Sequence, residues 1–591
     1  MKKCVRFEGA RIQVGQTEVY FEGKIKNVDE LAGIFLTRNP ADLAVAAYQR
    51  WGHNCVQHLS GTFALVVIDP VAQRIFCARD PSGTHPLYYC FEPNHFFAFG
   101  TRIQDVLSFE NVPKHIDNQT IERYLRGAQD YSPYAPDSFY EAVKRIEPGY
   151  GISFSADTVA NKTAWPMPLY PEISTQTELS ESDWVARFAE LFNESVSFQT
   201  DHCQRIGSHL SGGLDSSSVS AVAQLKNLKP IKTVQVHTGL ETIDERPFAE
   251  AVARNSGTSH HVVQPSDQVW QQLTATTALL GYPHQLALPP CFHWAASAKA
   301  AELGCDVLLT GHDGDTVVGY GNGHVQTILE QRQWDDLALA MEQLARKRDL
   351  SNLVKNWDSL SETEKISAFE VAFWGNEIKK SLQNRAFFST LNHLFSASLR
   401  FGVYPWQVFE WWRKRRPPAT SAPRTEAVHF AIDKREIKEN PATKATHYQQ
   451  IYCGRMLDVT EQLTHVGRHF GHQYAHPFYD RELVALCLAT PEKLRFDHGS
   501  GRGPLRRAMR GVLPEITRLR TQKSYFNAYN QQVSQLMATD ALGIFGKNHP
   551  LWQHADRDRF ARSCQNFSDQ PPALLHFNAV LQLGIWLDTR Q

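Results

Sequence analysis

The stretch "HLSGGLDSSSVSAV", from His209 to Val222, decides the fold of this chain. The apolar segment "RIGSHL" leads into it, and "SVSAVAQL" continues it with helical character. A strand that passes through a glycine-rich turn into a helix brings backbone N–H groups and the positive end of a helix dipole to one point. The stretch therefore predicts an anion site, and phosphate is the anion expected there.

The turn has small and hydroxylated residues where a phosphate would lie. Gly212 and Gly213 allow an anion to approach the backbone closely. The hydroxyl groups that can add donors belong to Ser211, Ser216, Ser217 and Ser218. The turn is not a P-loop of the G-x-x-x-x-G-K-[ST] type, because no lysine follows the glycines.

Asp215 places an acid inside this predicted anion site. A carboxylate beside a phosphate costs free energy unless a cation lies between them, so Asp215 predicts a bound Mg²⁺. The alternative is that Asp215 merely caps the start of a serine-rich helix, which is common in helices of any function.

Strands and helices alternate on both sides of this stretch. From Asp183 onward the alternating segments are "WVARFAELFNESV", "RIGSHL", "SVSAVAQL", "IKTVQVHT", "ERPFAEAVARNSG" and "HHVV". This alternation predicts a parallel sheet with helices on its faces. The segment "CDVLLTGHDGD" ends the block with another buried strand and a polar turn, and the chain from about residue 325 onward has mainly helical patterns.

The part of the chain before Asp183 has a different character. Residues 1–155 contain short apolar or aromatic runs separated by turn residues, among them "TFALVVID", "RIFCARD", "PLYYCF" and "FFAFGT". Residues 156–182 include three prolines and have no periodicity, so they are predicted to form a linker. The sequence thus predicts a β-rich front domain and a larger α/β domain.

The composition bounds the class of protein. The chain has 591 residues, 42% apolar and 21% charged, with a formal net charge of −1, which does not suggest a nucleic-acid partner. Its ten cysteines include no C-x-x-C pair, which favours a reducing compartment over disulfides or zinc. The start "MKKCVRFEGARIQVGQ" lacks a signal-peptide core, and no apolar run has membrane-spanning length. We therefore expect a soluble, cytoplasmic protein with no membrane partner.

Several motifs, taken in order, carry a resemblance to a known family. The string "SGGLDSS" resembles the pyrophosphate loop of the N-type ATP pyrophosphatases. Asparagine-synthetase-like enzymes are indicated by "LSGTFALVVIDPVAQRIFCARDPSGTHPLYY", "TIDERPFAEAVARNSGTSHHVV", "TGHDGDTVVGYG", "PFYDRELVALCLATPEKLR" and "LRRAMRGVLPEITRLRTQKSYF". The resemblance implies an α+β front domain at residues 1–155, an Ntn-hydrolase-like β-sandwich with helices and a degenerate glutaminase. It further implies an α/β ATP pyrophosphatase domain with helical additions at 183–591, with an insert at about 325–450.

In the enzymes that the chain resembles, ATP activates a carboxylate by adenylation, and an amine then displaces AMP. The resemblance assigns Asp215 and Asp315 to Mg²⁺. Asp315 follows the strand "DVLLT" much as Asp215 follows "RIGSHL", so the two acids would share one crevice if these strands are neighbours. Asp313 is held in reserve, because it could instead cap the turn, and Asp315 could be an ordinary loop carboxylate.

The resemblance also suggests catalytic residues. Lys523, in "RTQKSYF", matches the lysine that the family places near the reacting centre, and Arg520 is a second candidate for the same role. The alternative for both is a solvated basic segment, since five arginines lie nearby. His312 stands where asparagine synthetases have glutamate and β-lactam synthetases have tyrosine, so it could accept a proton from the attacking amine or could simply hydrogen-bond the loop.

The front domain departs from the family pattern. An active glutaminase of this type has an N-terminal cysteine, whereas this chain begins "MKKCVRF" and places Cys4 inside it. The glutamine-binding "NGE" is replaced by "FEGKIK", and the expected Ser-Glu pair is Thr101-Arg102. We therefore expect a domain that folds but does not hydrolyse glutamine; processing between Lys3 and Cys4 is the alternative.

Without glutaminase activity, the nucleophile is expected to be an amine of the substrate itself. Of the families with an inert front domain, the C-terminal motifs look closer to the lasso-peptide macrolactam cyclases than to the β-lactam synthetases. The resemblance then implies a precursor peptide as substrate, with a leader-peptide-binding protein and a peptidase as partners. Trp406, Trp411 and Trp412, beside the basic run 413–416, could help enclose a peptide or could pack inward. A small-molecule synthetase and a non-catalytic scaffold remain the alternatives.

Overall fold

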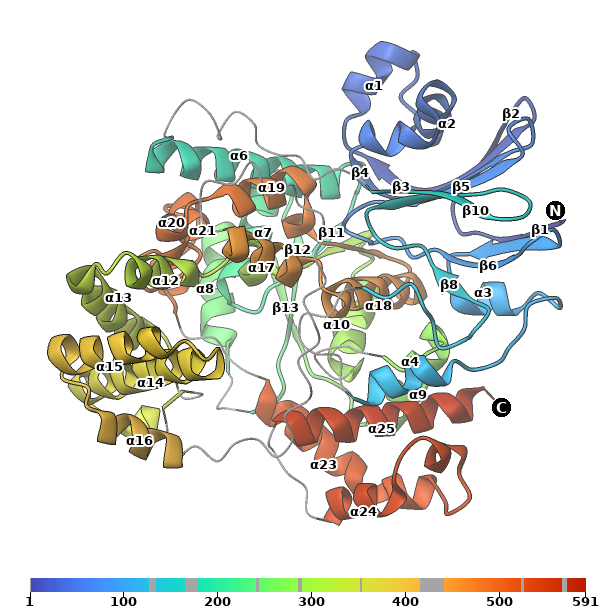
Figure 1. Ribbon diagram of the computed structural model, residues 1–591. Coiled ribbons are helices and arrows are strands. Elements are labelled where there is room, and N and C mark those ends of the chain that lie inside the picture. Colours follow the sequence, from blue (N-terminus) through green and yellow to red (C-terminus); the bar gives the residue numbers. More distant parts are fainter. Residues whose placement is uncertain are drawn as a thin grey trace.

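The computed structural model describes residues 2–126, 134–164, 179–240, 244–284, 290–350, 353–354, 356–414, 441–521, 526–565 and 571–590. Figure 1 shows a sheet-rich front domain at one end of the molecule, a parallel sheet in the middle and a group of helices at the opposite end. Within the described residues, no helix is both long enough and apolar enough to cross a membrane.

The front domain is a sandwich of two sheets, as expected for this part of the chain. The larger sheet has the order β10-β9-β5-β4-β3-β2, and the smaller one has the order β1-β7-β6-β8. Their strands are β1 (Lys2–Arg6), β2 (Ala10–Val14), β3 (Thr17–Ile25), β4 (Gly61–Asp69), β5 (Arg74–Arg79), β6 (Tyr88–Glu92), β7 (Phe96–Gly100), β8 (Lys144–Arg145), β9 (Tyr150–Phe154) and β10 (Val159–Ala164). The helices of this domain are α1 (Val28–Phe35), α2 (Pro40–Trp51), α3 (Ile103–Leu107) and α4 (Asn118–Leu125).

Strand β4 is apolar along most of its length because both of its faces are covered. Phe63, Leu65 and Val67 pack into the core beneath α1 and α2, whereas Ala64 and Val66 face the interior of the sandwich. Alternate residues of a strand point to opposite faces, so a strand between two cores needs apolar residues at every position.

The front sheet extends further than the sequence predicted. Residues Val159–Ala164, which fall in the predicted linker, form β10 and pair antiparallel with β9. An edge strand is held by backbone hydrogen bonds on one side only and needs no apolar alternation, so its polar sequence gave no signal. Helix α6 (Glu181–Thr200) starts two residues before the predicted Asp183, at a capping box in which Ser180 and Asp183 bond each other's backbone N–H groups.

The second domain contains a five-stranded parallel sheet in the order β13-β12-β11-β14-β15. Its strands are β11 (Ile206–His209), β12 (Lys232–Val236), β13 (Ser259–Val263), β14 (Val307–Leu309) and β15 (Gln473–Ala475). One face is covered by α6, α7 (Leu214–Leu225), α8 (Arg246–Ser256) and α19 (Arg481–Ala489), and the other by α10 (Pro290–Glu302) and α18 (Gly454–Phe470). The chain after residue 450 is mainly helical, as expected; β15 was not predicted, because three residues are too short to show a strand pattern.

Helices make up the remainder of the described chain. The outer group contains α12 (Asn322–Glu330), α13 (Trp334–Lys347), α14 (Glu362–Gln383), α15 (Phe387–Phe401) and α16 (Pro405–Lys414), which share a core around the buried Trp374. The others are α9 (Val269–Leu280), α11 (Gly314–Val318), α17 (Pro441–Ile451), α20 (Glu492–Phe496), α21 (Gly503–Ala508), α22 (Glu515–Arg518), α23 (Asn527–Ile544), α24 (Arg557–Gln565) and α25 (Pro571–Thr589). In Figure 1, α25 lies beside α9 and α4.

A buried ion pair joins the two domains. Arg79, at the end of β5, donates from Nη1 to Oε1 of Glu461 on α18 at 2.8 Å, and both side chains are 0% exposed. The hydroxyl of Tyr134 also donates to Glu461, and Arg145 pairs with Asp458 one turn earlier on α18. Burial opposes the charge of Arg79, but Glu461 and Tyr134 keep its pKa above the ordinary value. The front domain is therefore fixed to α18 by charges that solvent does not reach.

We expect Glu461→Gln to lower the free energy of unfolding by about 3–5 kcal/mol, because it leaves the Arg79 charge buried without its counter-charge. Denaturant titration measures this loss. The control is Glu122→Gln in the exposed Arg126–Glu122 pair of α4, which should change the free energy by less than about 1 kcal/mol. Equal effects of the two substitutions would contradict the role of the buried pair.

Candidate active site

The turn after β11 is braced by its own serines. Oγ of Ser211 and Oγ of Ser216 lie 2.9 Å apart, and the backbone N–H of Gly213 donates to Ser211 at 3.2 Å. Gly212 has φ +82°, and a Cβ on it would lie 2.7 Å from the backbone nitrogen of Ala249. The turn can therefore be formed only with glycine at this place. Gly213 is the N-cap of α7, so the start of that helix points into the turn.

The other two serines differ from each other. Ser217 is fully buried, and its hydroxyl has no hydrogen-bond partner within the described residues. Ser218 donates to the carbonyl of Leu214 inside α7, which is an ordinary helical bond. Ser218 thus has a structural role, whereas Ser211 and Ser216 shape the turn.

The strands that precede Asp215 and Asp315 are neighbours, as the predicted crevice requires. β11 and β14 pair in parallel, with Ser208 opposite Leu309. A Cβ on Gly311 would lie 2.4 Å from the backbone nitrogen of Ser216, and one on Gly314 would lie 2.8 Å from Cβ of Asp215. The turn after β14 therefore rests directly on the turn after β11.

Arg502 interacts with Asp215 and Asp315 and was not identified from the sequence. Its Nη1 lies 2.8 Å from Oδ2 of Asp215, and its side chain is 7% exposed. Burial opposes the charge of Arg502, but Asp215, Tyr320 and Asp315 raise its pKa above the ordinary value. The arginine arrives from a segment far along the chain, so no local pattern near either acid could have indicated it.

Arg520 touches the glycine-rich turn. Its Nη1 donates to the carbonyl of Gly212 at 3.3 Å and lies 2.9 Å from Oε1 of Glu245. Its guanidinium group also lies over the ring of Phe248, 4.2 Å from the centroid. The solvated-segment alternative is therefore wrong for Arg520. Lys523 lies outside the described residues, so its predicted role stays a prediction.

His312 has an acid and a phenol close to it. Its Nε2 lies 3.1 Å from Oδ2 of Asp313, and the hydroxyl of Tyr479 donates to the same oxygen at 2.5 Å. Asp313 occupies the N-cap position of α11, but its side chain makes no capping hydrogen bond. The Asp313 carboxylate therefore interacts with His312 and Tyr479 and does not cap the helix.

Further histidines lie near His312. The ring of His476, just after β15, has its centroid 5.9 Å from that of His312. Burial lowers the pKa of His476, and His312 and His209 lower it further. Burial also lowers the pKa of His293 to about 3, again with His209 and His312 among the contributors. His476 and His293 are therefore held in their neutral forms and resist protonation. His476 and Tyr479 follow the short strand β15, which the sequence pattern did not reveal.

The comparisons with known proteins match this arrangement. Residues 187–586 match the family model described as asparagine synthase, and residues 11–165 match a glutamine amidotransferase domain. The chain belongs to the asparagine synthase family. In the amidotransferase-like domain, Lys26 lies 2.6 Å from Asp480 and 2.8 Å from Glu482 of the synthase domain, and so helps to hold the two domains together.

Curated relatives of the family are distant. The chain is 25% identical over 274 residues to the glutamine-hydrolyzing asparagine synthetase 3 of Bacillus subtilis (strain 168), which is 42% of this chain and 43% of that protein. It is 25% identical over 372 residues to asparagine synthetase 2 of the same organism, covering 58% and 48%. Amidase chry2 of Gibberella zeae is 26% identical over 272 residues, covering 43% and 38%. Each match spans less than half of the relative's length.

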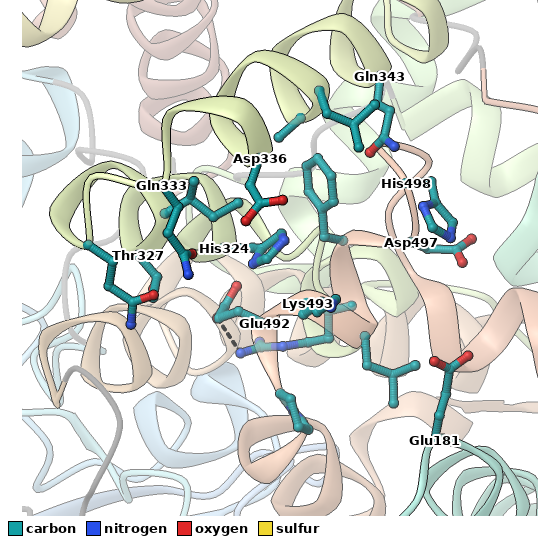
Figure 2. Close-up of a pocket in the computed structure, with 18 of the residues that line it drawn as sticks. Glu181, His324, Thr327, Gln333, Asp336, Gln343, Glu492, Lys493, Asp497 and His498 are labelled. Atoms are coloured by element: carbon teal, nitrogen blue, oxygen red, sulfur yellow. Dashed lines mark hydrogen bonds and ion pairs between the residues drawn. The ribbon is translucent and has the colours of Figure 1, made fainter. Parts of the chain in front are cut away.

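A large cavity lies away from these residues. It has a volume of about 900 Å³ and lies between the start of α6 and helices α12, α13 and α20. Figure 2 shows the Glu492 side chain paired with Arg495 on one wall and His324 and Asp336 near another. None of the predicted site residues lines it, so the cavity is separate from the predicted site at the braced turn.

The contact between the two turns yields a prediction. Gly311→Ala should lower the affinity for ATP at least about tenfold, because the added methyl group would push the backbone of Ser216 out of place. Isothermal titration calorimetry with ATP and Mg²⁺ measures the affinity. Gly33→Ala, where a Cβ meets nothing within 4 Å, is the matched control and should bind as the parent protein does. Unchanged binding by the Gly311 variant would show that the turns tolerate separation.

Proposed function

We propose that this protein is an ATP-dependent, AMP-forming carbon–nitrogen ligase that closes a macrolactam in a precursor peptide. A side-chain carboxylate of Asp or Glu would be adenylated, and the peptide's N-terminal amine would then form the amide. One observation supports the adenylation step of this proposal. The braced turn at Gly212 contacts Arg520, and Arg502 interacts with Asp215 and Asp315 beside it. The lasso-peptide substrate rests on the resemblance of the C-terminal motifs.

The residues present fit a Mg²⁺–pyrophosphate group. Within the described residues, no three His, Cys, Asp or Glu side chains converge to hold a metal by themselves. Mg²⁺ is usually held by one or two carboxylates together with substrate phosphates, and Asp215 and Asp315 supply such oxygen ligands. When bound, Mg²⁺ would neutralise the charge of the leaving pyrophosphate.

In the first step, a carboxylate oxygen of the substrate attacks the α-phosphorus of ATP and pyrophosphate leaves. The N–H groups at the start of α7 and the Ser211 and Ser216 hydroxyls bind the pyrophosphate oxygens. Arg520, anchored on the Gly212 carbonyl and Glu245, adds positive charge beside the turn. Lys523 is proposed to stabilise charge on the transferring phosphorus.

In the second step, the amine attacks the acyl carbon and AMP leaves with the bonding electron pair. The amine must lose a proton, and His312 is the proposed acceptor. Asp313, itself hydrogen-bonded by Tyr479, would orient the imidazole. The pathway partners, a leader-peptide-binding protein and a peptidase that frees the amine, belong to this proposal.

The two half-reactions can be separated with variants. Asp215→Asn should abolish AMP formation, because it removes a charge that holds the metal–pyrophosphate group. His312→Ala should still form AMP but should close the ring about 10²–10⁴-fold more slowly, since it removes only the proton acceptor. A synthetic core peptide with an N-terminal Gly and a downstream Asp or Glu is incubated with ATP and Mg²⁺. Mass spectrometry then distinguishes the ring, which has lost one water, from the unchanged linear peptide.

If the His312 variant cyclises the peptide at the parent rate, His312 is not the proton acceptor and is only a residue of the loop. The absence of AMP formation with every carboxylate-bearing peptide would instead favour a small-molecule substrate. Asp117→Asn is the control variant, because Asp117 caps α4 in the front domain and should affect neither step.

We also propose that the front domain does not hydrolyse glutamine. Cys4 lies within β1, where it pairs opposite Ala98 of β7, and Lys26 is engaged with Asp480 and Glu482. Incubation with glutamine and ATP should therefore release no more glutamate than Cys4→Ala does. Glutamate release that depends on Cys4 would return an asparagine-synthetase-like reaction to first place.

A further inference from the structure

Helix α15 has large apolar residues on two sides. Thr390, Ser396 and Ala397 are buried, and Leu394 and Phe401 pack against the core of the outer helices. Five more large apolar residues are exposed, namely Phe387, Phe388, Leu391, Phe395 and Leu399, Phe388 by 85%. Four of them, at 388, 391, 395 and 399, follow the spacing of one helical face. An apolar face turned toward water costs free energy, so this face is expected to have something that covers it.

The exposed face continues onto the next helix. Trp406 and Phe409 of α16 are 63% and 65% exposed, and the ring of Tyr404 stacks on Trp406 with the centroids 4.4 Å apart. Together with the five residues of α15, these three form what we call the aromatic face. In Figure 1, α15 and α16 lie at the end of the molecule opposite the front domain.

The two other tryptophans of α16 pack inward. The indole N–H of Trp411 donates to the carbonyl of Leu353, and that of Trp412 donates to Gly375, on which the ring of Trp411 also packs. The inward-packing alternative for these tryptophans is therefore right for Trp411 and Trp412 and wrong for Trp406. The helical group thus fills its own core and still leaves an aromatic surface outside.

Along the chain, the segment that carries the aromatic face has charges of one sign. Between Glu377 and Glu410 the sequence contains no Asp or Glu. The same segment contains four exposed cations, Lys379, Lys380, Arg385 and Arg400. A second copy of this chain would bring these cations against their own equivalents in a two-fold interface, which is unfavourable. The charge instead complements an anionic surface.

We propose that the aromatic face docks this protein on an anionic lipid bilayer. The side chains protrude rather than line a groove, since Phe387, Phe395 and Leu399 are each 66–67% exposed. A bilayer accepts protruding rings without a matching shape, whereas a protein partner would need complementary pockets. Trp and Tyr beside Lys and Arg are also the residues that favour the membrane–water boundary.

Docking of this kind does not require a helix to span the bilayer. The apolar side chains of α15 would enter only the boundary between headgroups and acyl chains, about 5–10 Å deep, and the cations would contact lipid phosphates. This replaces the expectation that no membrane takes part. It does not depend on the proposed ligase activity, because none of the site residues lies on the aromatic face.

Vesicle co-sedimentation of the full chain tests the proposal. The protein should sediment with phosphatidylcholine vesicles that contain phosphatidylglycerol and much less with phosphatidylcholine alone. Phe388→Ser/Phe395→Ser should weaken the binding at least about tenfold, and Arg385→Gln/Arg400→Gln should weaken it and reduce its salt dependence. Leu228→Ser/Leu536→Ser, at two other exposed leucines, is the control and should bind as the parent does. These substitutions lie at exposed positions, and the thermal midpoint checks that folding is retained.

Three results would overturn the proposal. The first is a parent protein that stays in the supernatant with anionic vesicles, and the second is a phenylalanine variant that sediments as the parent does. Light scattering could also show a dimer that the phenylalanine variant converts to monomers, without vesicle binding by either. That last result would assign the aromatic face to a second copy of the chain.

Discussion

The site depends on the close approach of two backbone turns at the carboxyl edge of the parallel sheet. β11 and β14 are paired neighbours, and Gly311 lets the turn after β14 rest on the nitrogen of Ser216. A side chain there would occupy space that the backbone already fills. Because the turns touch, Asp215 and Asp315 come within the reach of one arginine, Arg502. The rest of the site is arranged around this contact.

The domain junction shows how a buried charge can fix an arrangement. Arg79 and Glu461 are both inaccessible to water, and Lys26 adds a second ionic contact with Asp480 and Glu482. Such pairs are costly to leave incomplete, so they favour one docking geometry over others that would separate the partners. In this chain the front domain contributes Arg79 and Lys26 to that junction and thereby supports α18 and α19.

The outer helices add surfaces that the ATP chemistry does not use. Their core around Trp374 is complete. In α15, however, Thr390 and Ser396 are buried, whereas Phe387, Phe388 and Phe395 are exposed. The cavity drawn in Figure 2 lies where these helices meet α6 and α20. A helical group that packs well and still exposes aromatic rings is explained more readily by an external surface than by folding stability.

The sequence by itself determined the features that depend on local order. Strand, turn and helix around Gly212 follow from glycines and apolar runs, and the apolar run in β4 indicated a strand. Asp215 and Asp315 could be predicted because each follows a recognisable strand. Only the tertiary structure decided which distant groups meet them: Arg502 at Asp215, and Tyr479 at Asp313 beside His312. It also decided the pairing of β10 and β15, since backbone hydrogen bonds hold such strands whatever their side chains are. Likewise, only the packing decided which apolar residues of α15 lie outside, because a sequence pattern records which residues share a side and not what covers it.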